Sequence, residues 1–501
     1  KQATRLTRSD GFFNIIKQRA PNLGRYMGAL FDFLGIVFFV IVLFGAVPDL
    51  IDAWVNNYFV GEEGLFTAPE WPIKAVIVLG CVVTLLQFLR IGLQLTEAIQ
   101  LHLELDRNRA RERAIDMLAR SHKPLILAGG GIRIARAFEA LEEFADTIGV
   151  PVYTSFMGKG ALPAGHPENL GVAGVWGEYP ATEAARNADL ILAIGARFND
   201  LHTGSWIPGY VYNIPPTRLI QVDIDRQEIG RNYPVEIGIE ADAREFLARA
   251  TAIARQKGLK ASIAGWRREI EGWQSEWRNF TRPFETSGEV PIEPRRMLAD
   301  MNRISPPDTV MVDDVGNCQV WSEQYWMPKM AGTHMTSGGF AAMGFGVCGV
   351  LGARLARPDS PCVTLCGDGG FMMAPHAVAT AVEYDLPAVW VVQNNYAIGT
   401  IRDLQRVYLD GRELGTSFVN ERTGEFWNPD FVKMAEAMGA RGIRIEHPDQ
   451  FGDAYAEAIR SGVPTVLDVV INRDTGIPVT GTWQMPPSPE VQPTVGSRKI
   501  L

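Results

Sequence analysis

Cysteine and histidine are scarce in this sequence, and its positive charge is outweighed by negative charge. The 501 residues include 5 cysteines and 7 histidines, with no CxxC pair, which argues against a disulfide framework or a cysteine-based zinc site. The net charge of −9 and the isoelectric point near 5.5 indicate no basic surface for nucleic acid. With 47% hydrophobic and 21% charged residues, the composition is that of a globular protein, and the length predicts roughly three domains.

Charge is also missing from two long runs near the N-terminus. Phe33–Val47 is uncharged, and can be extended back to Tyr26 if Asp32 is tolerated; Ala75–Leu89 is uncharged as well. Each run is shorter than the roughly 20 residues of a spanning helix, but snorkelling side chains at the ends could complete both. The connection Pro48–Pro72 carries acidic residues and no Lys or Arg, whereas positive residues flank both outer ends.

This charge asymmetry predicts a membrane hairpin over residues 26–95, with both termini on the cytoplasmic side of the membrane. Trp54, Tyr58 and Trp71 stand where interfacial aromatics would stand. A pair of buried helices in a soluble protein is the alternative, and the charge pattern favours the membrane. The first run is internal and a second follows it, so a signal peptide is not indicated. Residues 96–122 are then interpreted as a charged connecting helix.

From residue 123 onward, short apolar runs alternate with glycine turns and an amphipathic segment. The predicted elements are strands at Leu125–Ala128, Pro151–Thr154, Asp189–Ile194 and Arg218–Val222, and a helix at Ala135–Ile148. This alternation predicts a Rossmann-like α/β domain over residues 123–254. The turn Gly129–Gly131 lacks a full GxGxxG, so its spacing alone does not support nucleotide binding. His166 and His202 are isolated and are interpreted as solvated loop residues.

Residues 255–290 form a charged linker that precedes a second α/β domain at 291–483. Trp266, Trp273 and Trp277 are spaced as one stripe of a helix, which predicts a linker helix packed on a domain. The tail 484–501 is rich in proline and is predicted to be extended.

The second α/β domain carries the clearest chemical signal. Cys362–Cys366 is a short apolar run, typical of a buried parallel strand. It ends at Gly367–Gly370, a turn whose glycines let main-chain N–H groups approach an anion. A helix-like segment, Ala374–Tyr384, and a second apolar strand, Ala388–Val392, follow. The order strand, turn, helix, strand predicts a βαβ unit.

Polar residues end both strands of this unit, where open α/β sheets bind their ligands. Asp368 offers a carboxylate oxygen and Asn395 an amide oxygen, a set of ligands suited to Mg²⁺. A Gly-Asp-Gly alone is common turn chemistry. Gly-Asp-Gly before a helix, with Asn-Asn after the next strand, is far more specific.

Gly367–Asn395 resembles the GDG…NN signature of thiamine diphosphate enzymes. Thr336–Ala353 resembles the glycine-rich segment of acetolactate synthases and related 2-oxo-acid enzymes, and Asp313–Trp321 resembles their diphosphate-contacting turn. The resemblance implies thiamine diphosphate and Mg²⁺ as cofactors, with Mg²⁺ held by Asp368, Asn395 and the main-chain carbonyl of Ala397.

The same resemblance implies further contacts with the cofactor. Met343 would hold its bent shape, and the carbonyl of Ala341 would accept a hydrogen bond from the aminopyrimidine. The remaining implied cofactor contacts are Asn317, Gly339, Gly367, Gly369 and Gly370. Cys318 stands where the synthases commonly have His, and Ala377 where they commonly have Glu, so analogy does not identify the substrate.

The middle segment is similar to the central domain of acetolactate synthases. The similarity rests on Phe156–Leu162, Gly195–Thr203 and Val222–Ile229. Several of those enzymes bind FAD there and many relatives keep the fold without it, so FAD is the less favoured alternative. Structural roles at turns and sheet ends are preferred over flavin contacts for Arg197, Asp223 and Asp225.

The N-terminal hairpin loosely resembles the small membrane subunit of TRAP-type transporters, through Ala68–Pro72 and Leu85–Leu95. In the thiamine diphosphate family a pyrimidine-binding domain precedes the other two and supplies the glutamate that activates the cofactor. No segment of residues 1–123 resembles that domain, so the catalytic residue is left unknown. A homo-oligomer, or a partner chain that carries the domain, is therefore expected.

The sequence thus predicts an α/β protein: two Rossmann-like, doubly wound parallel-sheet domains preceded by an α-helical membrane hairpin at 1–95. The leading functional hypothesis is a decarboxylase or carboligase that acts on a 2-oxo acid or aldehyde and needs a pyrimidine-binding domain from elsewhere. One alternative is a non-catalytic, membrane-tethered protein that binds the cofactor. The other is a TRAP-type small-subunit fragment fused to an enzyme fragment.

Overall fold

The computed structural model describes residues 21–56, 59–60, 68–86, 107–200 and 202–477, together with the short segments 494–495 and 498–499. The chain forms two compact units, residues 1–106 and 107–501. The basic segment 1–20, Tyr58, residues 87–106 of the predicted hairpin and connecting helix, and residues 484–493 of the tail lie outside the described residues.

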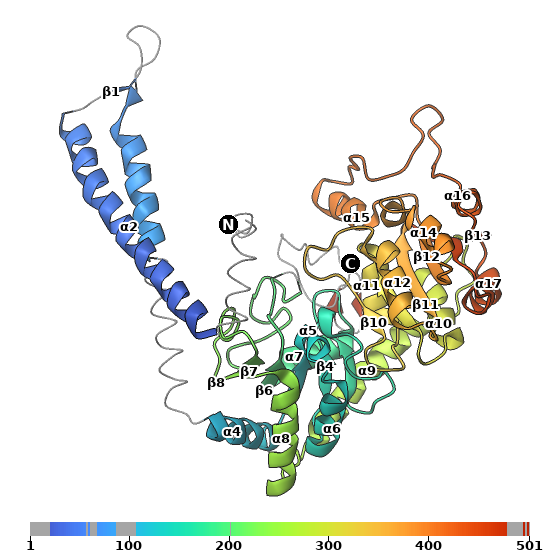
Figure 1. Ribbon diagram of the computed structural model, residues 1–501, viewed down its shortest axis with the longest axis horizontal. Coiled ribbons are helices and arrows are strands. Elements are labelled where there is room, and N and C mark those ends of the chain that lie inside the picture. The colour runs from blue at the N-terminus through green and yellow to red at the C-terminus, as the bar shows by residue number, and fades with distance from the viewer. Residues whose placement is uncertain are drawn as a thin grey trace. The chain divides into compact units, whose positions relative to one another are not determined.

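In its described residues, the first unit has two apolar helices and a short strand pair between them (Figure 1). Helix α2 spans Pro21–Val55, and the second helix spans Trp71–Leu86. Between them, β1 (Phe59–Val60) pairs antiparallel with β2 (Ala68–Pro69). The rings of Trp54 and Trp71 meet edge to face, with centroids 4.5 Å apart. Both predicted uncharged runs are therefore helical where they are described.

One of these helices is long and apolar enough to cross a membrane, judged by length and composition in the described part of the chain. It covers Ile36–Val55, with a mean hydropathy of 2.3. Its large apolar side chains are mostly exposed; Phe44, for example, is 86% exposed. The helix Trp71–Leu86 is shorter. The structure thus bears out the hairpin's helices, and its place in a membrane stays a prediction.

The central domain contains a six-stranded parallel sheet in the order β5-β4-β3-β6-β7-β8. Its strands are β3 Pro124–Ala128, β4 Val152–Thr154, β5 Asn169–Val172, β6 Leu190–Ile194, β7 Arg218–Asp223 and β8 Ile237–Glu240. This is the strand order of a Rossmann fold, which reverses between β3 and β6. The four predicted strands are confirmed, and β5 and β8 were not predicted.

The sheet is accompanied by helices and one 3₁₀ turn. They are α4 Arg107–Arg120, α5 Gly130–Ile134, α6 Phe138–Ile148, η2 Phe156–Gly158, α7 Tyr179–Asn187 and α8 Ala243–Lys257. The predicted helix Ala135–Ile148 begins three residues late, at Phe138. Arg136 has a φ of +50°, a left-handed conformation that a helix cannot continue through.

Helix α4 belongs to the central domain rather than to a separate connector. Ala114, Ile115 and Leu118 on this helix have no exposed surface, and α4 contacts α8 and β8. Ala114 and Ile115 lie four and three residues before Leu118, so the three side chains share one apolar face of the helix, which the domain buries. The predicted connecting helix at 96–122 is therefore corrected: its described part, 107–120, is packed into the fold.

The C-terminal domain contains a second six-stranded parallel sheet, in the order β10-β9-β11-β12-β14-β13. Its strands are β9 Val310–Asp313, β10 His334–Met335, β11 Cys362–Gly367, β12 Ala388–Asn394, β13 Arg441–Ile445 and β14 Thr465–Val470. Its helices are α10 Pro294–Ile304, α11 Asn317–Tyr325, α12 Phe345–Ala356, α13 Asp368–Phe371, α14 Ala377–Glu383, α15 Gly399–Tyr408, α16 Phe431–Ala437 and α17 Pro448–Arg460.

Helices cover both faces of this sheet. Val363 and Leu365 of β11 pack into one core with residues of α10, α11 and α17. Cys362 and Cys366 alternate with them and pack into a second core with residues of α12, α14 and α16. Alternate residues of a strand point to opposite faces, so the two cores lie on opposite sides. The predicted doubly wound arrangement is confirmed.

A single helix, α9 (Ala264–Glu285), packs against both domains. Trp266 lies in the core of the central domain and Trp277 in a core of the C-terminal domain, while Trp273 packs against both. The predicted tryptophan stripe is confirmed as packing. In the tail, β15 (Thr494–Val495) pairs antiparallel with β16 (Arg498–Lys499).

Candidate cofactor-binding site

The strand order of the C-terminal sheet reverses between β9 and β11, and polar residues gather there. Leu365 of β11 pairs with Asp313 of β9, and Gly367 pairs with Gln393 of β12. The carboxyl ends of three neighbouring strands therefore meet at one edge. Ligands of open α/β sheets bind at such a reversal, and the topology brings the ends of the two predicted strands to it.

Asp368, Asn395 and Ala397 converge at this edge. The Oδ2 of Asp368 and the Oδ1 of Asn395 both accept from the main-chain N–H of Ala397, at 3.3 and 3.1 Å. The Oδ1 of Asp368 accepts from the N–H of Gly369 at 2.8 Å. The Asp368 side chain is fully buried. Two oxygens from different strands are thus held around one point.

Asn428 completes this cluster and was not predicted. Its amide Nδ2 donates to the Oδ2 of Asp368 and to the Oδ1 of Asn394, both at 2.8 Å. It lies between α15 and α16, in a stretch without a recognisable motif. Burial raises the pKa of Asp368 to about 6, while this hydrogen bond lowers it. A cation at the carboxylate would favour its charged form further.

Asp314, the second residue of the Asp-Asp pair after β9, organises the glycine-rich segment. Its carboxylate accepts from the N–H of Gly344 at 2.9 and 3.1 Å and from the N–H of Gly346 at 3.3 Å. A Cβ on Gly370 would lie 2.2 Å from the Oδ2 of Asp314. Gly370 must therefore lack a side chain, and Asp314 is a site residue that the sequence reasoning missed.

Met343 lies at the site, next to Gly369. A Cβ on Gly369 would lie 3.3 Å from the Met343 methyl carbon. Ala341 has a φ of +51°, an uncommon conformation for a residue other than glycine. Ala341 and Gly339 are both exposed. A Cβ on Gly367 would meet nothing within 4 Å, so that glycine is not required by packing.

Asn317 begins α11 and lies beside Asn395. Its Oδ1 accepts from the Thr400 hydroxyl at 2.6 Å, and its Nδ2 donates to the Oδ2 of Asp403 at 2.8 Å. A Cβ on Gly399 would lie 2.8 Å from the amide nitrogens of both Asn317 and Asn395. Asn317 is therefore brought to the site, with its side chain oriented by α15.

A second candidate site lies at the reversal of the central sheet. The main chain of Gly129 and Gly131 packs directly on Gly195; a Cβ on Gly129 would lie 2.1 Å from the Gly195 carbonyl oxygen. Beside these glycines is a cavity of about 530 Å³. Its place is that of nucleotide sites in Rossmann folds.

The cavity wall includes residues that were interpreted differently from the sequence. Arg197, Asp223 and Asp225 all line the cavity, although structural roles were preferred for them. His202 also lines it and stacks on Phe156, with ring centroids 4.2 Å apart. His202 is therefore half-buried and packed against an aromatic ring, which corrects the interpretation of a solvated loop residue.

His166 is likewise held by neighbours rather than by solvent. Its Nδ1 accepts from the N–H of Glu168 at 3.1 Å, and its Nε2 lies 3.3 Å from a carboxylate oxygen of Asp146. Its side chain is only 7% exposed. The prediction of a solvated His166 is also wrong, since Glu168 two residues on and Asp146 of α6 supply partners for its two ring nitrogens.

Two family models match the chain. Residues 111–250 match the thiamine pyrophosphate enzyme central domain, and residues 314–469 match the C-terminal thiamine pyrophosphate-binding domain. The chain carries the central and C-terminal domains of the thiamine pyrophosphate enzymes. Neither match includes residues 1–106, so the resemblance of the hairpin to a transporter subunit stays a prediction.

Curated relatives agree with this assignment. The chain is 35% identical over 377 residues to a probable acetolactate synthase large subunit of Methanocaldococcus jannaschii, covering 74% of this chain and 61% of the relative. It is 31% identical over 367 residues to the acetolactate synthase isozyme 3 large subunit of Escherichia coli, covering 72% and 61%. The acetolactate synthase of Mycobacterium bovis is 30% identical, with 73% and 58% covered. The chain thus spans about three fifths of these relatives.

The residues of the C-terminal domain fit thiamine pyrophosphate, also called thiamine diphosphate, held through a divalent cation. The side-chain atoms of Asp368 and Asn395 that converge are oxygens, the ligand type that Mg²⁺ binds. Gly370 leaves free the space that a Cβ would fill beside Asp314. The donor set and the glycine-lined turn both agree with the family match.

Proposed function

We propose that this chain holds thiamine diphosphate and Mg²⁺ and takes part in the decarboxylation or carboligation of a 2-oxo acid. The observation that carries the proposal is the convergence of Asp368 and Asn395 on the N–H of Ala397, at the strand reversal of a thiamine pyrophosphate-binding domain. The printed names of the relatives, acetolactate synthases, support the reaction class. When bound, thiamine diphosphate supplies an electron sink for cleavage of the bond to the carboxylate.

In this proposal Asp368, Asn395 and the carbonyl of Ala397 ligate Mg²⁺. Met343 supports the bend of the cofactor, and the Ala341 carbonyl accepts from its aminopyrimidine. The residues proposed to lie against the rest of the cofactor are Asn317, Gly339, Gly367, Gly369 and Gly370. Asp314 and Asn428 position these groups through the hydrogen bonds described above.

A second protein surface is proposed to complete the site. Residues 339–342 are exposed, and Phe340 is 80% exposed. A second protein surface that covered this segment would bury Phe340 beside the cofactor. We therefore expect a homo-oligomer, or a partner chain with a pyrimidine-binding domain, to cover this segment and supply the activating carboxylate.

The experiment that tests the function is exchange of the C2 proton of the cofactor. The full chain would be loaded with thiamine diphosphate and Mg²⁺, and exchange would be followed by quenched NMR. Exchange faster than in free cofactor would place the activating carboxylate within this chain. Tight binding without faster exchange of the C2 proton would indicate that a partner chain supplies the activating carboxylate. Failure to bind at all would contradict the proposed function.

Membrane attachment through residues 26–95, with the enzyme domains on the cytoplasmic side, is proposed separately. It is supported by the apolar, largely exposed helix Ile36–Val55 and by the flanking charges. Alkaline carbonate extraction of membranes from expressing cells tests it. Phe44→Glu should release part of the chain to the soluble fraction, whereas a fully soluble wild-type chain would contradict the proposal.

A further inference from the structure

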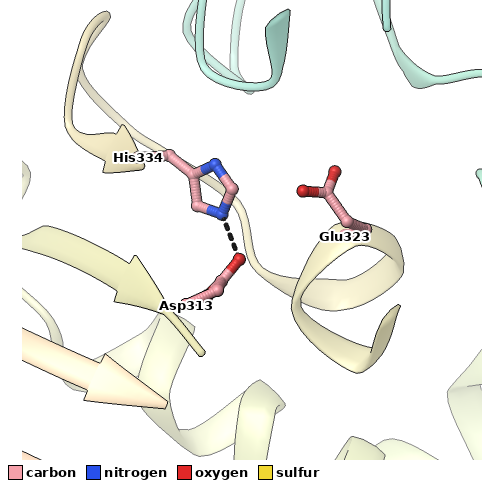
Figure 2. Close-up of side chains that lie close together, drawn as sticks. All are labelled: Asp313, Glu323 and His334. Atoms are coloured by element: carbon pink, nitrogen blue, oxygen red, sulfur yellow. Dashed lines mark hydrogen bonds and ion pairs between the residues drawn. The ribbon is translucent and has the colours of Figure 1, made fainter. Parts of the chain in front are cut away.

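Three side chains with metal-binding atoms meet in the interior, on the far side of β9 from the cofactor site. Asp313 ends β9, Glu323 lies on α11 and His334 begins β10. Their side chains have no exposed surface, and their ligand atoms all lie within 4.8 Å of one another. Figure 2 shows Asp313 and Glu323 directed toward the His334 ring from two sides.

Several polar atoms of this cluster have no hydrogen-bond partner in the described part of the chain. They are the Oδ1 of Asp313, both carboxylate oxygens of Glu323 and the Nδ1 of His334. The one direct contact within the cluster joins the His334 Nε2 and the Asp313 Oδ2, at 2.7 Å. Buried polar atoms are nearly always satisfied. A buried carboxylate with two unpaired oxygens therefore points to a missing cation or proton.

The cationic side chains of Lys159 and Arg133 lie nearby, but neither forms an ion pair with the carboxylates of this cluster. The Nζ of Lys159 donates to the main-chain carbonyl of Glu323 at 2.8 Å. A guanidinium nitrogen of Arg133 donates to the main-chain carbonyl of Lys159 at 3.1 Å. Among the described residues, no ion pair within 4.0 Å joins either side chain to the carboxylates of Asp313 or Glu323. The unpartnered atoms of Asp313, Glu323 and His334 therefore indicate that another group binds between these three side chains.

We propose that Asp313, Glu323 and His334 bind a divalent transition-metal ion of the Zn²⁺ type. One imidazole and two carboxylates are ligands of such ions, with bonds of about 2.0–2.2 Å. The His334 Nε2 and the Asp313 Oδ2 lie 2.7 Å apart, closer than two ligands of a tetrahedral ion, so binding would replace this hydrogen bond and move the two atoms slightly apart. Glu323, whose two carboxylate oxygens are both unpartnered, would complete four-atom coordination as a bidentate ligand. Mg²⁺ is disfavoured because it keeps bound waters, which a fully buried site excludes.

The protonation state of His334 agrees with this ligand set. Burial lowers the pKa of His334, and Lys159 and Arg133 lower it further, while Asp313 raises it. A neutral imidazole is the form that binds a metal. Glu323 is the residue on which the metal and a proton would compete, because burial raises its pKa well above the usual range.

Such an ion would connect three elements that lead into the cofactor site. β9 continues into Asp314, α11 begins at Asn317, and β10 continues into the glycine-rich segment before Met343. Asp313 contacts His334, whereas the carboxylate of the adjacent Asp314 accepts from the N–H groups of the glycine-rich segment, so the proposed site is separate from the one at Asp368. Its role is to fix the relative positions of these elements.

The test is the metal content of the purified full chain, measured by mass spectrometry without added transition metals. About one Zn²⁺ per chain is expected, and Glu323→Gln and His334→Asn should each reduce it at least tenfold. Glu178→Gln, which alters a nearby carboxylate outside the cluster, is the matched control and should keep the metal. Removal by chelation should lower the Tm by about 5 °C or more, and added Zn²⁺ should restore it.

A second measurement covers variants that fail to fold. Co²⁺ added to the chelated wild-type chain should give the visible absorption of a nitrogen- and oxygen-ligated ion. Asp368→Asn should leave both metal content and this spectrum unchanged, which separates this site from the proposed Mg²⁺ site. A wild-type chain without metal that also fails to take up Zn²⁺ or Co²⁺ would overturn the proposal and leave Glu323 as a buried neutral acid.

Discussion

Each of the two parallel sheets reverses its strand order, between β3 and β6 in the central domain and between β9 and β11 in the C-terminal domain, but different groups lie at the two reversals. In the central domain, main-chain atoms of Gly129, Gly131 and Gly195 pack together beside an open cavity of about 530 Å³. In the C-terminal domain, the side chains of Asp314, Asp368 and Asn395 are buried and accept hydrogen bonds from main-chain N–H groups. The reversal in the central domain thus has a cavity beside it, whereas the reversal in the C-terminal domain has a cluster of buried polar side chains.

The difference indicates two kinds of ligand. A hollow lined by glycine main chain selects a ligand by shape, whereas converging carboxylate and amide oxygens select a hard cation and, through it, a diphosphate. The strand order alone would not distinguish these cases. The residues at the strand ends do.

The largest effect should come from filling the contact between glycines in the central domain. Gly129→Ala would place a Cβ 2.1 Å from the Gly195 carbonyl oxygen, and because both partners are main chain, neither can move aside easily. We expect a loss of about 4 kcal/mol in the free energy of unfolding. Denaturant unfolding checks it. Gly165→Ala, whose Cβ would meet nothing within 4 Å, should be neutral; equal losses would refute the close packing.

The next largest effect concerns how folding stability depends on pH through His202, which lines the cavity of the central domain. Burial lowers the pKa of His202 from 6.5 to about 4. The unfolded chain therefore takes up a proton near pH 6.5 that the folded chain takes up only near pH 4, and stability falls as the pH drops through this window. The contribution is at most roughly 3 kcal/mol. In His202→Gln the fall between pH 6.5 and 4 should be shallower; an unchanged slope would contradict the lowered pKa of His202.

A smaller effect should come from Asn428, which hydrogen-bonds the side chain of Asp368. Asn428→Ala removes a 2.8 Å hydrogen bond to the Oδ2 of Asp368. Groups that orient a metal ligand typically change metal affinity about 10–100-fold when removed, and we expect the lower end. Thiamine diphosphate titration at fixed Mg²⁺ measures it. Asn420→Ala on the same connection, which has no contact with Asp368, is the control and should bind normally.

The sequence predicted those parts of the site that are contiguous. Gly367–Gly370 and Asn395 stand at strand ends that short continuous apolar runs reveal, and the pairing of β11 with β12 brings them together as expected. The tryptophan stripe of α9 was also readable, because helical spacing shows which side chains share a face. Each of these signals lies within a few residues.

Contacts made at long range were not predictable in the same way. Asn428 reaches Asp368 across 60 residues, and nothing in its local sequence marks it. Asp313, Glu323 and His334 have no spacing of a metal motif, because β9, α11 and β10 bring them together only in the folded domain. The left-handed conformation at Arg136 shortened a predicted helix for a reason that no local pattern announces.

The central claim is that Asp368 holds thiamine diphosphate through a divalent cation. Calorimetric titration of the full chain with thiamine diphosphate, with and without Mg²⁺, tests it directly on wild type, Asp368→Asn and the exposed-turn control Asp385→Asn. Wild type and the control should bind only with Mg²⁺, and Asp368→Asn should bind at least about 100-fold more weakly, about 2.7 kcal/mol. Equal binding by Asp368→Asn, or binding that ignores Mg²⁺, would contradict the account.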